Sequence, residues 1–169
     1  STMLALFIIN GEASRLILDE NKSKMTSLVV NVEPLIDKNY LEDFIKSGGN
    51  TKTTAFQKLN ENLLNIRNFN RREDTFLFSI FILKKDPSNQ NYYFIIDTNK
   101  NTYGQSYPEF MERGLKRMQG KSGAYIYPTE KGDKIVGYTP IYDSGGKLLA
   151  ILGVEQGRDQ VYMGLEKLL

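Results

Sequence analysis

The chain has 169 residues, of which 40% are hydrophobic and 25% are charged, and its formal net charge is +2. These values predict one globular domain, and the small charge, without a basic stripe among aromatic residues, argues against a nucleic-acid partner. Cys and His are both absent, which excludes disulfides, thiol nucleophiles and Cys-based zinc sites and removes the commonest general base. We therefore expect no enzyme activity, no metal site and no cofactor.

The N-terminal segment 3–9 is an uncharged apolar run that ends at Asn10-Gly11. A membrane span needs about 20 apolar residues, so this run cannot cross a bilayer alone. Two interpretations stay open: the run is the outer end of a transmembrane helix, or it is the buried start of a helix within the fold. No basic residue precedes it, which argues against a signal peptide.

Residues 11–32 predict a long amphipathic helix, because apolar residues recur with the helical period. The recurring positions are Ala13, Leu16, Ile17, Met25, Leu28, Val29 and Val32. The stripe slips between Asp19 and Lys24, where most residues are charged, so this part of the helix is expected to be exposed or to meet a partner helix. A plain core-facing helix is the alternative.

Two shorter helices are predicted next. After a proline, residues 35–46 can form a helix that ends in a Gly-Gly cap. Thr51 or Thr53 then caps a helix that is predicted to run through Arg72. Its apolar stripe, at spacings of three and four residues, consists of Phe56, Leu59, Leu63 and Ile66.

A strand pair follows the helices. Residues 75–83 are apolar on both faces and rich in β-forming residues, which predicts a buried central strand. Residues 92–97 are predicted to be its hairpin partner. Asp97 ends this partner strand among turn-forming residues, and we interpret it as a turn residue.

A helix and three more strands are predicted in the last part of the chain. They are a helix from 108 to 120 and strands at 123–127, 135–142 and 148–154. Pro108 suits the helix start and Gly120 its end, while turns at 131–133 and 143–146 join the strands into hairpins. Antiparallel hairpins, with helices grouped ahead of them and one helix inserted, predict an α+β domain with a five-stranded antiparallel sheet.

The last hairpin, GYTPIYDSGGKLLAILGVE, resembles that of the extracytoplasmic single Cache sensor domains of bacterial membrane signalling receptors. The matching residues are Pro140, Ile141, Tyr142, Asp143, Gly145, Gly146, Gly153, Val154 and Glu155. The resemblance implies a PAS-like fold for the whole of 1–169. It divides the chain into a helical part at 1–72, a sheet with an inserted helix at 75–156, and a C-terminal exit helix at 157–169.

The resemblance also implies a function and a setting. Such domains are extracytoplasmic input modules of chemoreceptors, histidine kinases or diguanylate cyclases, anchored by flanking membrane helices, and their long first helix forms a homodimer seam. The segment 103–121 would roof a pocket that binds a small molecule, with Tyr125, Tyr127 and Tyr138 as its walls. The alternative is a PAS-like module without a ligand that dimerises or binds another protein.

Arg113 and Arg117 lie four residues apart on one face of the predicted roof helix. Two guanidinium groups on one face suit a carboxylate or phosphate, and tyrosines can add hydroxyl donors. We therefore expect a small anionic ligand bound by Arg113, Arg117, Tyr103, Tyr125, Tyr127 and Tyr138. Ordinary exposed charges, supported by Glu109 one turn before Arg113, are the alternative. Amino-acid-binding members of the family carry an Arg, then Trp-Tyr motif, which this Trp-free chain lacks.

Overall fold

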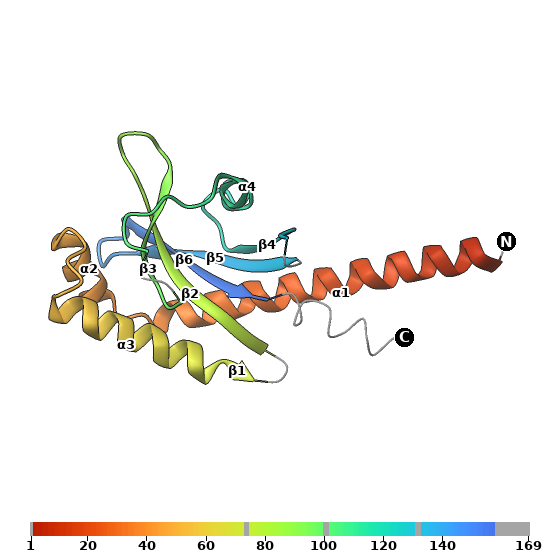
Figure 1. The fold of residues 1–169 in the computed structure, drawn as a ribbon, viewed down its shortest axis with the longest axis horizontal. Helices are drawn as coiled ribbons and strands as arrows, with labels where there is room; N and C mark the ends of the chain where they lie inside the picture. The colour runs from red at the N-terminus through yellow and green to blue at the C-terminus, as the bar shows by residue number, and fades with distance from the viewer. Residues whose placement is uncertain (1, 73–74, 100–101, 131–132, 158–169) are drawn as a thin grey trace.

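The protein folds around one antiparallel sheet (Figure 1). The computed structural model describes residues 2–72, 75–99, 102–130 and 133–157. Within these ranges the strands are β1 (Arg71–Arg72), β2 (Thr75–Lys85), β3 (Tyr92–Asp97), β4 (Gly123–Tyr127), β5 (Lys134–Tyr142) and β6 (Leu148–Gln156). Strands β2 to β6 form a five-stranded sheet in the order β3-β2-β6-β5-β4, and the two-residue β1 pairs with the start of β2.

The predicted fold class is confirmed. The sheet is antiparallel throughout, and β2 and β6 lie in its middle, as expected for the two most apolar strands. The inserted helix α4 (Glu109–Arg117) lies between β3 and β4 in the chain. This is the α+β arrangement that the sequence predicted, with an antiparallel sheet, helices grouped ahead of it and one helix inserted.

The long helix α1 (Thr2–Val32) lies across one face of the sheet and extends beyond it (Figure 1). Its C-terminal half is anchored by Met25, Val29 and Val32, all buried. Leu16, nearer the N-terminus, is 64% exposed. The side chains of segment 3–9 lie outside the described residues, so both interpretations of that segment stay predictions. Among the described helices, none combines the length and the apolar content that a membrane crossing requires.

Two shorter helices cover the same face as α1. They are α2 (Lys38–Lys46), which follows a 3-10 turn at Glu33–Leu35, and α3 (Thr54–Phe69). Asp37 caps α2 by accepting from the N–H of Tyr40, and Thr53 caps α3 by accepting from the N–H of Phe56. The predicted cap at Thr53 is therefore confirmed. Between the two helices Gly48 and Gly49 take positive φ angles of 68° and 77°.

The predicted end of α3 is wrong by three residues. The helix ends at Phe69 rather than Arg72, and Arg71–Arg72 form β1 instead. The reason lies at Asn70, whose backbone N–H and side-chain amide both donate to the carbonyl of Ile66 and close the last turn. The start of α2 is also later than predicted, at Lys38, because the 3-10 turn takes up the residues before it.

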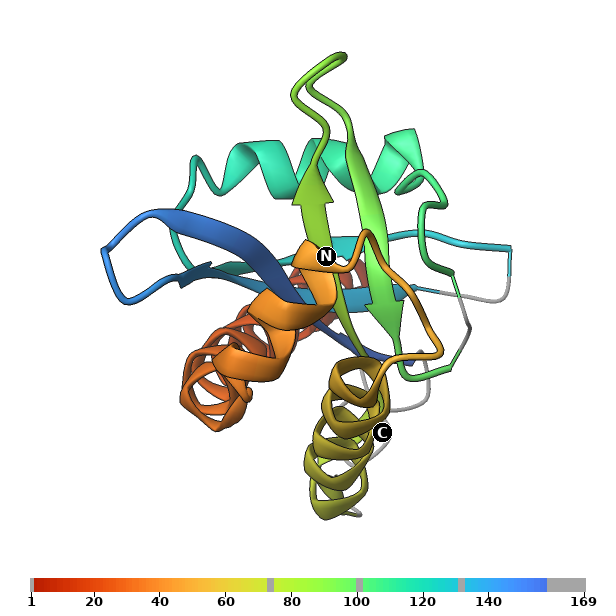
Figure 2. The same cartoon turned by 90° about the vertical axis from the view of Figure 1, so that its left-hand side faces the viewer.

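Helix α4 lies on the opposite face of the sheet, so that the sheet is sandwiched between it and the other helices (Figure 2). A second apolar core fills this side. It comprises Phe81, Leu83, Tyr107, Met111, Leu115, Tyr127, Val136, Tyr138 and Ile151. Glu112 is buried in α4, accepts from the N–H of Tyr92 at 2.8 Å and pairs with Lys116 at 3.2 Å, which fixes α4 to the start of β3.

The last hairpin has the predicted turn. Oδ1 of Asp143 accepts from the N–H groups of Gly145 and Lys147, both at 2.9 Å, and Gly146 has a φ of 79°. The exit helix predicted at 157–169 falls almost wholly on 158–169, which lie outside the described residues. The turn expected at 131–133 is likewise described only at Asp133.

Gly137 sets how closely α1 approaches the sheet. A Cβ at this position would lie 2.7 Å from the backbone carbonyl oxygen of Met25. Backbone cannot swing aside as a side chain can, so we expect Gly137→Ala to lower the free energy of unfolding by about 1–3 kcal/mol. Urea unfolding measures this change. Gly145→Ala is the matched control, because its Cβ would meet only Oδ1 of Asp143 at 3.3 Å; equal losses in both variants would contradict the prediction.

Candidate ligand pocket

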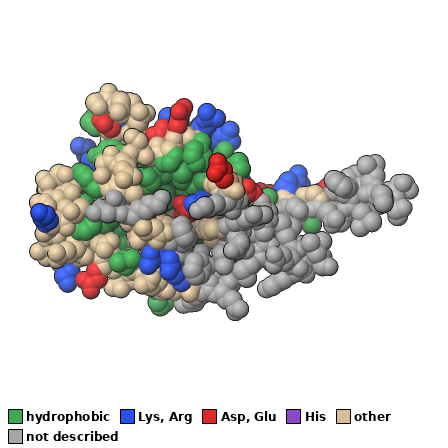
Figure 3. Space-filling view, viewed as in Figure 1, with side chains coloured by type: hydrophobic (Ala, Val, Ile, Leu, Met, Phe, Trp, Pro, Cys, Tyr) green, Lys and Arg blue, Asp and Glu red, His purple; other side chains and the backbone are tan. Residues whose placement is uncertain are grey.

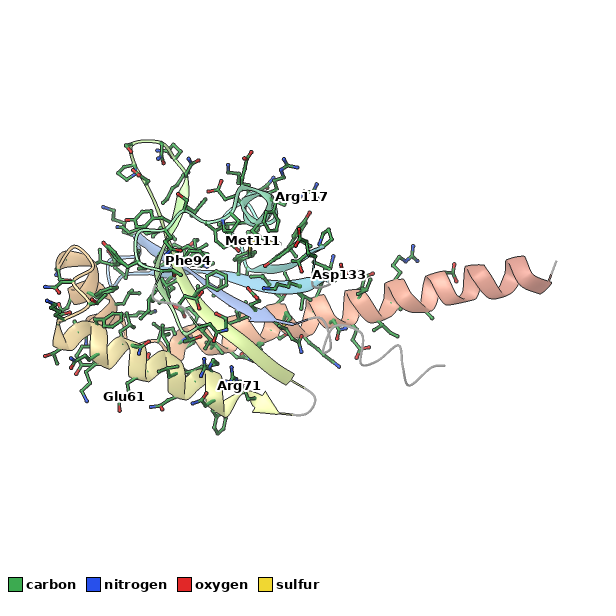
Figure 4. All side chains as sticks on the ribbon, in the orientation of Figure 1. Glu61, Arg71, Phe94, Met111, Arg117 and Asp133 are labelled. Atoms are coloured by element: carbon green, nitrogen blue, oxygen red, sulfur yellow. The ribbon has the colours of Figure 1, made fainter. Side chains whose placement is uncertain are left out.

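A cavity of about 300 Å³ lies on the α4 side of the sheet, and we call it the inner pocket. Every strand from β2 to β6 contributes to its wall, together with α4 and the segment before it. The lining residues are Ser79, Phe94, Asp97, Asn99, Thr102, Gln105, Ser106, Pro108, Phe110, Met111, Tyr127, Thr129, Lys134 and Glu155. In Figure 4 the labels of Phe94 and Met111 mark its position between the sheet and α4. Its volume suits a small molecule.

One side of the inner pocket is polar, and its centre is Asp97 at the end of β3. Oδ1 of Asp97 accepts from the hydroxyl of the buried Ser79 at 2.7 Å and from the N–H of Asn99 at 2.9 Å. The second bond is the turn that the sequence predicted. The first shows that the same carboxylate is also held against β2, where it faces the pocket.

A buried ion pair forms another part of the polar wall. Glu155 on β6 is buried and pairs with Lys134 on β5, with Oε1 and Nζ 2.7 Å apart. Glu155 lies opposite Ser79 and Val136 in the sheet, beside an irregularity in the pairing of β2 with β6. A buried carboxylate is costly unless it is paired, and Lys134 supplies the pairing charge from the pocket rim.

Two hydroxyls in the inner pocket have no hydrogen-bond partner among the described protein groups. They are Oγ1 of Thr102 and the phenol oxygen of Tyr127. Thr102 is only 4% exposed and Tyr127 only 2%, so neither hydroxyl reaches bulk solvent in this arrangement. Unsatisfied buried hydroxyls are rare in folded proteins and call for an explanation.

Tyr107 and Tyr138 form a hydroxyl–hydroxyl hydrogen bond directly behind Tyr127. Burial raises the pKa of Tyr107, Tyr127 and Tyr138 above that of a free tyrosine, and the nearby Glu155 adds to the rise. All three phenols therefore stay protonated at any physiological pH. The hydroxyl of Tyr127 is a neutral group that can both donate and accept.

A second, more open hollow of about 790 Å³ adjoins the inner pocket, and we call it the outer hollow. Its lining residues are Phe110, Arg113, Tyr125, Tyr127, Pro128, Thr129, Glu130 and Lys134. The rings of Tyr125 and Tyr127 are stacked, with centroids 6.3 Å apart, and the edge of Phe110 meets Tyr127 at 5.8 Å. Figure 3 shows hydrophobic side chains exposed between α4 and the sheet, with basic side chains beside them.

Most of the predicted site residues lie on or beside the two hollows. Arg113, Tyr125 and Tyr127 line the outer hollow, and Tyr127 also lines the inner pocket. Arg117 stacks over the ring of Tyr125 at 5.5 Å, on the outer side of α4 (Figure 4). Tyr138 is buried behind both hollows and contacts Tyr107.

Tyr103 lies apart from the other predicted site residues. Its ring packs edge-on against Phe44 at 5.6 Å and covers Gly49, and it lines a separate hollow beside the β2–β3 loop. Tyr103 therefore packs the segment before α4 against α2 and the α2–α3 loop.

The polar groups of the inner pocket were missed by the sequence analysis. Glu155 did carry a signal, because it is an acidic residue at the end of a nearly continuous apolar strand. Thr102 carried none, since a threonine in a polar loop is unremarkable. Lys134 sits at the start of β5, and nothing in the sequence pairs it with Glu155.

Several solved structures are similar to this chain. The ligand-binding domain of the Pseudomonas aeruginosa PAO1 amino acid chemoreceptor PctC, in complex with GABA, matches at 10% identity and a TM-score of 0.47, over 99% of this chain and 66% of its own length. The periplasmic domain of RsbU from Chlamydia trachomatis matches at 14% identity and a TM-score of 0.45, over 96% of this chain and 58% of its own length.

A Campylobacter jejuni chemoreceptor domain in complex with L-valine matches at 10% identity and a TM-score of 0.40, over 89% of this chain and 65% of its own length. This chain thus spans less than two thirds of each of these structures. No protein-family model and no curated protein matches the chain. Likenesses at this level say nothing about what the chain binds.

Replacing Tyr127 or Tyr138 by Phe is expected to change the free energy of unfolding in opposite directions. Tyr127→Phe removes a buried hydroxyl that no described protein group satisfies, so we expect the free energy of unfolding to rise by about 1 kcal/mol. Tyr138→Phe breaks the bond to Tyr107 and is expected to lower it by about 1 kcal/mol. Urea unfolding of the ligand-free protein measures both. A loss in Tyr127→Phe as large as that in Tyr138→Phe would show that the Tyr127 hydroxyl is structural.

Proposed function

We propose that this chain is an extracytoplasmic sensor domain of a membrane signalling receptor, and that it binds a small molecule in the inner pocket. The observation that carries this proposal is the pair of unpartnered, buried hydroxyls of Thr102 and Tyr127, two residues that line the same cavity. Leaving each hydroxyl unsatisfied costs about 1–3 kcal/mol, and a ligand that bonds to both would offset that cost.

The surroundings of these hydroxyls support a recognition role. Asp97 and Glu155 are held in fixed positions by Ser79 and Lys134, so that the pocket wall is organised before a ligand enters. If these positions contributed only to folding, apolar side chains there would stabilise the protein more than charged ones. An anionic group on the ligand would meet Arg113, which lines the outer hollow.

The geometry also suggests how binding would be transmitted. Glu155 lies at the end of β6, one residue before the strand stops, and the chain leaves the sheet there toward its C-terminus. A ligand that changes the Glu155–Lys134 pair would act directly on this exit. Lys134 lies on β5, and β5 contacts α1 at Gly137, so a shift in β5 would also move the N-terminal helix. The signal would be a ligand-induced shift in the populations of two arrangements of the sheet and helices.

The receptor context belongs to the same proposal. The long α1 would lead toward the membrane and pair with α1 of a second copy to make a homodimer, and segment 157–169 would lead to a second membrane helix. The whole of 1–169 would act as one sensory unit.

A thermal-shift screen against amino acids, organic acids, phosphates, polyamines, sugars and nucleobases tests the proposal. A ligand at a hundred times its dissociation constant adds about 2.7 kcal/mol of stability, which for a chain of this length is roughly 5–10 °C. We expect the shift to shrink by at least half in Tyr127→Phe and in Thr102→Val, although Tyr127→Phe is expected to be more stable without ligand.

Ser88→Ala is a suitable control for the screen, because Ser88 is exposed in the β2–β3 loop and bonds only locally to Asp86. It should leave the ligand-induced shift unchanged. If no compound moves the midpoint of the unmodified protein, the sensor proposal fails, and the alternative of a ligand-free dimerisation or interaction module gains support.

A further inference from the structure

The outer hollow is lined by three aromatic rings, and one of them, Phe110, projects largely into solvent. Phe110 is 51% exposed, although the neighbouring Met111 on α4 is buried in the core. The rings of Tyr125 and Tyr127 form a stacked wall opposite, and Tyr125 is only partly buried. An exposed aromatic ring that faces other rings across one hollow is typical of a binding surface.

The outer hollow adjoins the inner pocket, and the two share part of their walls. Phe110, Tyr127, Thr129 and Lys134 line both. Tyr127 shows the connection most clearly, because its ring stacks on Tyr125 in the outer hollow while its hydroxyl is buried near Glu155. A ligand bonded to this hydroxyl would therefore lie beside the aromatic wall and could extend along it.

The charges of the two hollows differ. Among the described residues that line the inner pocket, the carboxylates of Asp97 and Glu155 face the single cation Lys134. Two carboxylates in one pocket wall suit a head group that donates hydrogen bonds, and an ammonium is the simplest such group, although Arg67 also lies near Asp97. The outer hollow instead offers flat apolar walls, with Arg113, Lys134 and Glu130 as its charged groups, and the guanidinium of Arg113 suits the face of an aromatic ring.

We propose that the two hollows form one elongated site, whose ligand carries an ammonium head in the inner pocket and a flat aromatic group in the outer hollow. This inference rests on the proposed function and narrows it to a class of ligand. A free amine without a ring would fill only the inner pocket, and a ring with an anionic head would meet the carboxylates of Asp97 and Glu155.

Three simple probes test this class of ligand by isothermal titration calorimetry on the unmodified chain. Phenethylamine carries both groups, ethylamine carries only the head, and phenylpropionate carries the ring with the opposite charge. Burying a phenyl group against aromatic walls should make phenethylamine bind roughly tenfold or more tightly than ethylamine. Phenylpropionate should bind more weakly than phenethylamine, by roughly tenfold or more.

Phe110→Ala and Leu148→Ala form a matched pair of variants. Both residues are about half exposed, at 51% and 50%, but Leu148 lies at the start of β6, in the hairpin remote from the outer hollow. Phe110→Ala should reduce the preference for phenethylamine over ethylamine to about twofold, mainly by weakening the binding of phenethylamine. Leu148→Ala should leave both affinities unchanged.

The inference is overturned if phenethylamine does not bind, if ethylamine binds equally well, or if Phe110→Ala keeps the preference. It is also overturned if the ligands found in the broad screen lack a flat group. In each of these cases a screen hit that depends on Tyr127 would still support the sensor function, whereas the absence of any hit would end both proposals. A change in oligomeric state in Phe110→Ala, measured by sedimentation, would place a second copy of the chain in the outer hollow and would also overturn the inference.

Discussion

The central strands of this protein are apolar on both faces, and that constraint determines the rest of the structure. Both faces of β2, β5 and β6 must be covered, so the chain places α1, α2 and α3 on one face and α4 on the other (Figure 2). The coverage is unequal. Helix α4 has 9 residues and spans about 14 Å, whereas the strands of 9 to 11 residues beneath it run to about 30 Å or more.

The short α4 therefore leaves part of its face of the sheet to other groups, and the inner pocket lies there. Residues that would be apolar under a longer helix are instead Asp97, Ser79, Glu155 and Lys134. Each carboxylate is held by a neighbour, since a buried charge without a partner would destabilise the fold by several kcal/mol. Among the described residues of this pocket, the buried hydroxyls of Thr102 and Tyr127 lack such a partner. Their unsatisfied hydrogen bonds lower the free energy of unfolding, as is common at functional sites.

The attachment of α4 gives this face its stability without filling the pocket. Glu112 fixes the helix to the start of β3 through the N–H of Tyr92, and Met111 and Leu115 anchor its inner side. These contacts lie on the helix itself, while the pocket wall before it is a loop that contains Thr102. The pocket thus lies between a helix that these contacts fix to the sheet and a loop.

The sequence by itself determined the secondary structure and the fold class, because those depend on local periodicity and on turn residues such as Thr53, Asp143 and Gly146. It failed at the end of α3, where a side-chain bond from Asn70 outweighs the apolar pattern. It also brought Arg113, Tyr125 and Tyr127 to one surface, since helix and strand periods fix which residues share a face.

Only the tertiary structure decided the composition of the inner pocket. Glu155 and Lys134 are distant in sequence and meet because β5 and β6 pair in one register, and the segment before α4 brings Thr102 to the wall of the same pocket. The tertiary structure also separates Tyr103 from the other predicted tyrosines, because its ring packs on Phe44 and Gly49. Contacts of this kind depend on strand register and on helix length relative to the sheet, and neither quantity is encoded in the spacing of residues along the chain.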